Sequence, residues 1–516
     1  MSAGVRAEFA HLHVASSYSL HYGTATPRAL AARAAELGME ALALTDRDGL
    51  YGAFKHVNAC ADAGIKPMLG ADLALSAGVL SPSAGVLFAG VLSPSAGTAP
   101  TGETAPRASR LLPAARPARS GRPARVTLLA TSRQGWASLC RLVSAAHAGA
   151  EETPEVTPEL IADHAAGLVV LLGPASDVGQ AIAARRPDVA RRALDGWRHL
   201  GVDAVVEIVD HLEHKSTFRA ARLAELAGEA GIPAVLTNAV RYLDPAGSLA
   251  AQVLDAARHL LPLGSPRLVS HNGRAHLASP ADMAAIAERV AAAMARPART
   301  AARLLTDTAE LARRCVLDPA RDLGVGSHHL PESQGTAAAQ HEELRDRCEY
   351  AILHGRYRTA SAANRAPGVS RMRAARNARD RLEHELDIIA ATGMAAYFLT
   401  VADVADRIRK AGIRCAIRGS GAGSFVNHLL GISAIDPLEH DLLMERFLSP
   451  VRATLPDIDL DVESARRLDA YRIIFDAYGA ERTACVCMME TYRARSAIRD
   501  VAAAMSLPPD EIGAIA

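Results

Sequence analysis

The sequence predicts an α/β protein that continues into a second, mixed α and β unit. Strand and helix patterns alternate through the first half, an alanine-rich helical region follows, and an acidic strand lies near the end. With 516 residues the chain is long enough for two to four domains, and its hydrophobic content of 49% is enough for well-formed cores.

The composition limits the class of protein. With 57 basic and 56 acidic residues the net charge is +1, so any contact with nucleic acid has to be local. The seven cysteines are scattered and include no CxxC pair, which is typical of a reduced, intracellular protein. The N-terminus has no hydrophobic signal core and no apolar run reaches the length of a membrane span, so we expect a cytoplasmic protein.

The first strands and helices follow a β-α-β-α-β order. Thr26 and Pro27 form an N-cap and a first-turn proline that begin a helix, and Gly38 ends it. The buried strand Ala41–Leu44 then places Asp46 beyond its carboxyl end. Because repeated strand–helix units build parallel sheets, we expect functional groups at the carboxyl ends of the strands. Further strands are expected near 11–14, 67–70, 126–130, 167–172, 204–209 and 233–237.

Two segments separate this pattern from the second unit. Residues 75–125 contain a duplicated Gly-Val-Leu-Ser-Pro-Ser-Ala-Gly and a tract of Ala, Pro, Arg and Ser, which we interpret as a disordered surface insertion. A helical connector is expected over 266–330. The second unit then has helices near 376–391 and 396–411, each ended by a glycine.

The acidic stretch at 456–461 carries the strongest chemical signal. Acidic and aliphatic residues alternate with the period of a strand, so Asp457, Asp459 and Asp461 share one face while the residues between them point into a core. Successive carboxylates lie about 6–7 Å apart at Cβ, which suits a pair of hard cations. A calcium loop is excluded because Val462 stands where glycine is needed. A solvated edge strand stays an open alternative.

A glycine-rich turn that begins Arg418-Gly419-Ser420 lies between a short strand and a helix start. This arrangement presents backbone N–H groups to a phosphate. Its spacing matches neither the P-loop nor the dinucleotide fingerprint, so a flexible turn stays open. Nearby, Arg446 and Arg452 suit bidentate contacts with phosphate oxygens, or ordinary ion pairs. With the acidic strand, these residues predict metal-assisted phosphoryl transfer involving a nucleoside triphosphate.

Several motifs of the second unit occur in one order. They are Tyr397-Phe398-Leu399, Arg418–Ser424, Asp436-Pro437-Leu438, Glu445–Leu448 and Pro456–Asp461. In this order they resemble the palm of the bacterial DNA polymerase III alpha subunit, a C-family DNA polymerase. The first half resembles the N-terminal polymerase and histidinol phosphatase (PHP) domain of that family, an α/β barrel. Residues 491–500 are more similar to the error-prone lineage than to the main replicase.

The resemblance implies a DNA-directed DNA polymerase that adds deoxynucleotides to a primer 3′ end, in replication or in error-prone repair synthesis. It implies that Asp457 and Asp459 are two of three catalytic carboxylates and hold two Mg²⁺ ions. The residues that it places on the incoming triphosphate are Arg418, Gly419, Ser420, Arg446 and Arg452. The implied partners are primer–template DNA and deoxynucleoside triphosphates. A sliding clamp and accessory proteins would bind through regions beyond this chain.

The PHP part departs from the family pattern. Intact sites of the family hold metals through histidines and acids at strand ends, for 3′–5′ exonuclease or phosphatase chemistry. This sequence keeps His13, Asp46 and His211. Other ligand positions are occupied by Ala15, Arg47, Asp72, Ala239 and Arg241. Because guanidinium cations oppose metal binding, we expect a metal-free, structural PHP domain.

The resemblance also implies the order of domains. The expected parts are a PHP domain at 1–265, the connector at 266–330, a palm at 331–488 and the start of a thumb at 489–516. The third carboxylate and the fingers come later in the family, so we expect a chain truncated near the thumb and inactive alone. Two alternatives stay open: a non-catalytic remnant that binds DNA or nucleotide, and a PHP-type phosphoesterase or 3′–5′ exonuclease.

Overall fold

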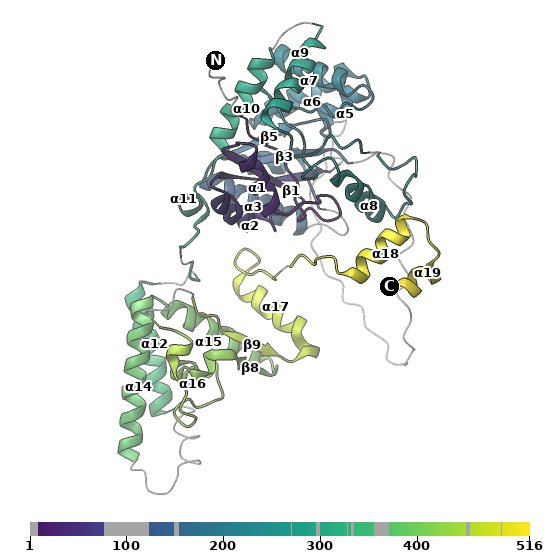
Figure 1. Ribbon diagram of the computed structural model, residues 1–516. Coiled ribbons are helices and arrows are strands. Elements are labelled where there is room, and N and C mark those ends of the chain that lie inside the picture. Colours follow the sequence, from purple (N-terminus) through teal and green to yellow (C-terminus); the bar gives the residue numbers. More distant parts are fainter. Residues whose placement is uncertain are drawn as a thin grey trace, which may run out of the picture. The chain divides into compact units, whose positions relative to one another are not determined.

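The chain forms two compact units, which are shown in Figure 1. Unit 1 comprises Met1–Val325 with Met488–Ala516, and unit 2 comprises Gly326–Cys487. The computed structural model describes residues 9–76, 123–148, 154–269, 271–295, 300–327, 329–331, 335–354, 371–449, 455–486 and 488–516, without the side chains of 371–375. The expected low-complexity insertion at 75–125 therefore lies largely outside the described residues.

A curled sheet with the strand order β1-β2-β3-β5-β6-β7 forms the centre of unit 1, and β4 pairs with β2. Its strands are β1 Ala41–Arg47, β2 Lys66–Leu75, β3 Arg125–Ala130, β4 Glu155–Val156, β5 Leu168–Leu172, β6 Asp203–Ile208 and β7 Ala234–Leu236. Both faces are buried: Leu128 of β3 packs in one apolar cluster and its neighbour Leu129 in another. Strands buried on both faces consist of continuous apolar runs, and these runs are why the strands could be predicted from the sequence.

The sheet is not wholly parallel, so that part of the expectation is wrong. β3 runs antiparallel to both of its neighbours, with Leu73 of β2 opposite Val126 and Thr127 opposite Leu171 of β5. The strand–helix rule gives parallel pairs only where each connection returns the chain to the same end of the sheet. The chain enters β3 from the opposite end. The pairs β1·β2, β5·β6 and β6·β7 are parallel as expected.

The segment at 11–15 links the two edges of the sheet. On one side Thr45 of β1 donates its N–H to the carbonyl of Val14 at 2.8 Å. On the other side Ala15 donates to the carbonyl of Val240, just after β7, also at 2.8 Å. The strand expected at 11–14 is therefore only an isolated bridge at Val14, but it closes the sheet into the expected α/β barrel.

Several helices of unit 1 pack on the strands of its sheet, whereas α18 and α19 lie beyond α8 (Figure 1). The helices of unit 1 are α1 Pro27–Glu36, α2 Ala53–Ala63, α3 Arg133–Ala148, α4 Pro158–Asp163, α5 Asp177–Ala183, α6 Pro187–His199, α7 Ser216–Ala230, α8 Gly247–His259, α9 Pro280–Ala292, α10 Ala301–Cys315, α11 Pro319–Leu323, α18 Ala494–Ala504 and α19 Pro509–Ile515. The expected cap is confirmed, because the Thr26 side chain accepts from the N–H of Ala29. Helices α9 and α10, within the range expected as a connector, pack on α7 and β7, and α18 packs on α8.

Unit 2 surrounds a cluster of aromatic and aliphatic side chains. Its elements are α12 Ala337–Leu353, α14 Arg371–Thr392, α15 Ala395–Lys410, β8 Cys415–Arg418, the 3₁₀ turn η1 Gly419–Gly423, α16 Phe425–Leu429, η2 Met444–Arg446, β9 Asp459–Val462, η3 Ser464–Arg466 and α17 Arg467–Tyr478. Leu386, Phe398, Phe425 and Phe447 are buried together. The Phe398 and Phe447 rings meet edge to face at 6.1 Å between centroids, a favoured aromatic geometry.

Across the described residues, no single helix is long and apolar enough to cross a membrane. Helices α14 and α15 pass that test of length and composition only as a pair, and the pair is bent by 113°. Their apolar residues Leu386 and Phe398 are fully buried in the core of unit 2.

Replacing Phe398 by alanine should destabilise unit 2 by about 3–5 kcal/mol, because the cavity left by a buried ring is only partly refilled. Both tryptophans, Trp136 and Trp197, lie in unit 1. Denaturant unfolding should therefore show an earlier transition by far-UV circular dichroism and an unchanged one by tryptophan fluorescence. A shift of both signals would contradict the separate cores.

Candidate functional site

The acidic strand pairs with the strand that leads into the glycine-rich turn. β9 runs antiparallel to β8, with Arg418 opposite Asp459 and Ala416 opposite Asp461. The Arg418 guanidinium lies 3.9 Å from the Asp459 carboxylate and 3.4 Å from that of Asp461. Both carboxylates are more than half exposed, so these are loose surface ion pairs. The ladder thus brings together two segments that the sequence assigned to one site.

The predicted alternation along the acidic stretch is confirmed. Asp457, Asp459 and Asp461 are exposed, while Ile458 is partly buried against the core of unit 2. The N–H of Ile458 donates to the Tyr397 hydroxyl at 2.7 Å, which holds the chain just before β9. Burial raises the pKa of Tyr397, and the Asp457 and Asp459 carboxylates add to the shift, so the phenol stays protonated at neutral pH.

The glycine-rich turn is exposed where it follows β8. Arg418, Gly419 and Ser420 are all exposed. Gly419 has a φ of +78°, a left-handed conformation that favours glycine, and a Cβ there would meet nothing within 4 Å. A Cβ on Gly423 would lie 2.9 Å from the Leu443 carbonyl oxygen, so the end of the turn packs tightly on the segment before η2. The turn therefore has an open beginning and a packed end.

The helix start after the turn does not offer its N–H groups to a phosphate, so that part of the expectation is wrong. The N–H groups of Phe425 and Val426 donate to the buried Glu385 carboxylate at 2.9 and 3.0 Å. The N–H of Asn427 donates to the Ser424 side chain at 3.2 Å. The carboxylate occupies the position where an anion would bind at the end of a helix. Only the exposed start of the turn, at Arg418–Ser420, is left as a candidate contact for a phosphate.

The other two arginines expected on the triphosphate, Arg446 and Arg452, follow this turn in the sequence. Arg446 is exposed on η2, and η2 packs against η1. The neighbouring Glu445 accepts a hydrogen bond from His384 at 2.9 Å, and this bond lowers the pKa of its carboxyl group. Arg452 lies outside the described residues.

In unit 1, His13 is held by a buried carboxylate. Its Nδ1 lies 2.8 Å from Glu207 and 3.3 Å from the Thr127 hydroxyl, and Thr237 donates to the same Glu207 oxygen at 2.6 Å. Burial alone would lower the pKa of His13, but the charge and hydrogen bond of Glu207 raise it above its usual value. Glu207 was not predicted, although an acid between the apolar residues Val206 and Ile208 of β6 was a usable signal.

Asp46 is buried at the end of β1 and is enclosed by hydrogen-bond donors. Its carboxylate accepts from the N–H of Ser16 at 2.7 Å and from the Ser19 hydroxyl at 2.7 Å. Burial raises its pKa to about 6, and these donors oppose the rise. The donors link the segment before α1 to β1, which is a structural role.

Arg47 and Arg241, at two positions where the resemblance implies metal ligands, both pair with buried acids. Arg47 donates to Asp72 at 3.1 Å, and Arg125 donates to both oxygens of Asp72. Burial alone would raise the pKa of Asp72, but Arg125 and Arg47 lower it. Arg241 makes a two-point contact with Asp255, with both N···O distances at 3.1 Å. These acids are paired with guanidinium groups.

His211 makes a separate contact. Its Nε2 lies 2.8 Å from the carbonyl oxygen of Asn238, and burial lowers its pKa. Within the described ranges no group of three or more His, Cys, Asp or Glu side chains could hold a metal ion. His13, Asp46 and His211 are thus not assembled into one ligand set.

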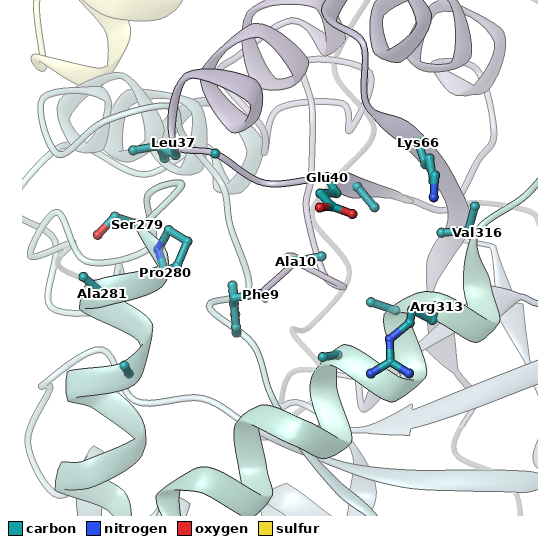
Figure 2. A pocket seen from close by; sticks show the side chains of 15 residues that line it. Phe9, Ala10, Leu37, Glu40, Lys66, Ser279, Pro280, Ala281, Arg313 and Val316 are labelled. Carbon is teal, nitrogen blue, oxygen red and sulfur yellow. The ribbon is translucent and has the colours of Figure 1, made fainter. Parts of the chain in front are cut away.

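A cavity of about 530 Å³ lies beside the amino ends of the barrel strands β1 and β2, where Ala41 and Lys66 line it. Figure 2 shows Glu40, Lys66 and Arg313 among the side chains that line it. Because β1 and β2 begin beside this cavity and run parallel, Asp46 and Asp72 lie at the opposite ends of those strands. The cavity belongs to neither candidate site.

Two families match successive parts of the chain. Residues 11–211 match the PHP domain, and residues 346–516 match the bacterial DNA polymerase III alpha NTPase domain. The chain thus carries a PHP domain followed by a region similar to the bacterial DNA polymerase III alpha NTPase domain. Its PHP domain is the barrel of unit 1.

Relatives carry the same combination along almost the whole chain. The error-prone DNA polymerase of Mycobacterium bovis is 32% identical over 98% of this chain and 42% of its own length. The error-prone DNA polymerase of Nocardia farcinica is 31% identical over 98% and 43%. The DNA polymerase III subunit alpha of Xylella fastidiosa is 29% identical over 98% and 39%. The chain therefore spans about two-fifths of the length of these relatives.

The His13–Glu207 pair should make the stability of unit 1 depend on pH. Because the folded state raises the pKa of His13 above 6.5, its stabilisation is complete below pH 6.5 and is lost as pH rises through the raised pKa. At acidic pH, His13→Gln should lower the free energy of unfolding by about 1.5–3 kcal/mol, and the difference should shrink at alkaline pH.

Tryptophan fluorescence during denaturant unfolding measures this difference. The exposed His214 provides the control, because His214→Gln should leave the pH dependence unchanged. An equal loss from His13→Gln at all pH values would contradict the charged pair.

Proposed function

We propose that this chain supplies the PHP domain and part of the palm of a DNA-directed DNA polymerase, which extends a primer 3′ end on a DNA template with deoxynucleoside triphosphates. One observation carries the proposal. The β8–β9 pair places Arg418 within 4 Å of two exposed carboxylates, beside the open start of the glycine-rich turn. Anionic and cationic groups for a metal–triphosphate complex thus lie on one two-stranded sheet.

The carboxylates suit Mg²⁺. Asp459, the first residue of β9, and Asp457, two positions before it, offer exposed hard oxygen ligands. Two carboxylates are sufficient, because Mg²⁺ commonly binds one or two carboxylates and completes its shell with water and substrate phosphates. Bound Mg²⁺ would neutralise the triphosphate and polarise the phosphoryl group. We assign Asp457 and Asp459 as carboxylate ligands of the two ions.

The remaining residues would orient the triphosphate. Arg418 is loosely paired with Asp459 and Asp461, so it can turn to phosphate oxygens once cations balance those carboxylates. The Ser420 hydroxyl and the backbone at Gly419 are exposed beside it. Arg446 lies on η2, which packs against this turn. These groups hold the substrate and do not transfer protons.

We infer a structural role without metal for the PHP domain. Asp72 and Asp255 are each paired with arginine, and His13 is paired with Glu207, so these groups already have partners. A metal would have to displace buried guanidinium groups, which is costly. The free cysteines among the described residues suit the reducing cytoplasm, where we place the protein.

The double variant Asp457→Ala/Asp459→Ala should lose Mg²⁺-dependent binding of deoxynucleoside triphosphate, because it removes both hard ligands. Isothermal titration with dATP, in Mg²⁺ and in EDTA, measures the effect. Asp476→Ala is the matched control, since Asp476 is an exposed acid that lies on α17 and not in the acidic stretch. Unchanged binding by the folded double variant would refute the assignment.

Purified protein should contain no stoichiometric zinc or manganese, and dialysis against EDTA should leave the tryptophan unfolding transition unchanged. Plasma emission spectrometry measures the metal content. Stoichiometric metal that disappears in a His13→Ala/His211→Ala variant would refute the structural role and favour a PHP phosphoesterase.

A further inference from the structure

A buried carboxylate on α14 anchors the packed end of the glycine-rich turn. Glu385 is fully buried. One of its oxygens accepts from Arg381 Nε at 2.7 Å and from the N–H of Phe425 at 2.9 Å. The other accepts from the Ser424 hydroxyl at 2.9 Å and from the N–H of Val426 at 3.0 Å. Four donors leave the carboxylate fully satisfied and fixed.

Arg381 extends this anchor to a second segment. Its terminal nitrogen Nη2 donates to the carbonyl of Gly423, at the end of η1, and to the carbonyl of Leu442, just before η2, both at 3.1 Å. One guanidinium therefore joins α14, the glycine-rich turn and the segment that leads to Arg446. A lysine could not span both carbonyls while keeping its contact with Glu385, because it lacks the planar fork of nitrogens.

Arg381 and Glu385 do not lie on the exposed face of the site. Glu385 contacts the turn from the core side, whereas Arg418 and Ser420 are exposed. Gly423 reinforces the contact, since the Leu443 carbonyl leaves no room for a Cβ. The two residues therefore set where the nucleotide-contacting segments lie relative to each other without reaching the nucleotide.

We propose that Arg381 and Glu385 are positioning residues for nucleotide binding, which hold the glycine-rich turn and η2 in one arrangement. This inference rests on the proposed function of the same site. A buried ion pair is often no more stabilising than apolar residues of the same volume. The Arg381–Glu385 pair would instead act by fixing the glycine-rich turn and η2 relative to each other, a role that does not depend on a gain in stability.

The test measures dATP binding with Mg²⁺ by isothermal titration on the full chain, at a temperature well below unfolding. Arg381→Lys keeps a positive charge for Glu385 but loses the two carbonyl contacts. It should bind dATP roughly tenfold more weakly, as expected for a small misplacement of contacting groups, with a nearly unchanged unfolding midpoint. Glu385→Gln should weaken binding further.

Glu383→Gln is the matched control. Glu383 lies on the same helix and pairs with Arg345 of α12, away from the turn, so its loss should leave dATP binding unchanged. Hydrogen exchange of the amides at 419–423 gives a second measurement, which should be faster in Arg381→Lys and unchanged in the control.

The outcomes separate the two proposals. If wild-type protein binds dATP and folded Arg381→Lys binds equally well, the positioning role is refuted, whatever Glu385→Gln does. If Asp457→Ala/Asp459→Ala also binds like the wild type while Arg381→Lys does not, the metal assignment fails and the positioning role stands. If wild-type protein does not bind dATP, both proposals are overturned.

Discussion

The candidate site of unit 2 depends on the pairing of β8 with β9. Carboxylates at alternating positions of one strand face repel each other, and β9 has only four residues with which to oppose that repulsion. The opposite strand contributes both ladder hydrogen bonds and the positive charge of Arg418. Tyr397 holds the chain where it enters the strand. Without this pairing the acidic strand and the glycine-rich turn would be unrelated surface segments.

Burial distinguishes the aspartates at the ligand positions of unit 1 from those of the acidic strand in unit 2. In unit 1, Asp72 and Asp255 are buried, and each is paired with an arginine on another element. In unit 2, Asp457 and Asp459 are exposed, and Asp459 makes only a loose pair with Arg418 at 3.9 Å. A buried carboxylate must have its partner before the fold is complete, whereas an exposed one keeps its capacity for cations from solution. The same residue type is therefore structural in one unit and suited to binding in the other.

Local patterns in the sequence predicted much of this structure. Buried apolar runs located the strands, Thr26 located the start of α1, and acidic alternation assigned the exposed face of β9. Contacts between distant residues were not predicted. Neither the direction of β3 nor the partnership of Glu385 with α16 has a local signal, because each is decided by the path of the chain through the whole unit. The roles assigned to Arg418, Asp457 and Asp459 stay predictions.

The closure of the barrel has a consequence for synthesis in the cell. Val14 is made early, but its partner Val240 follows only after nearly the whole sheet has been made. At about 5–20 residues per second, the ribosome needs roughly 10–45 s to reach Val240 after Val14. During that interval one edge of the nascent sheet has no partner, and unpaired edges are where chains associate wrongly. The closing contact of the barrel thus cannot form until Val240 has left the ribosome, so slow translation through unit 1 would lengthen the time for which that edge is exposed.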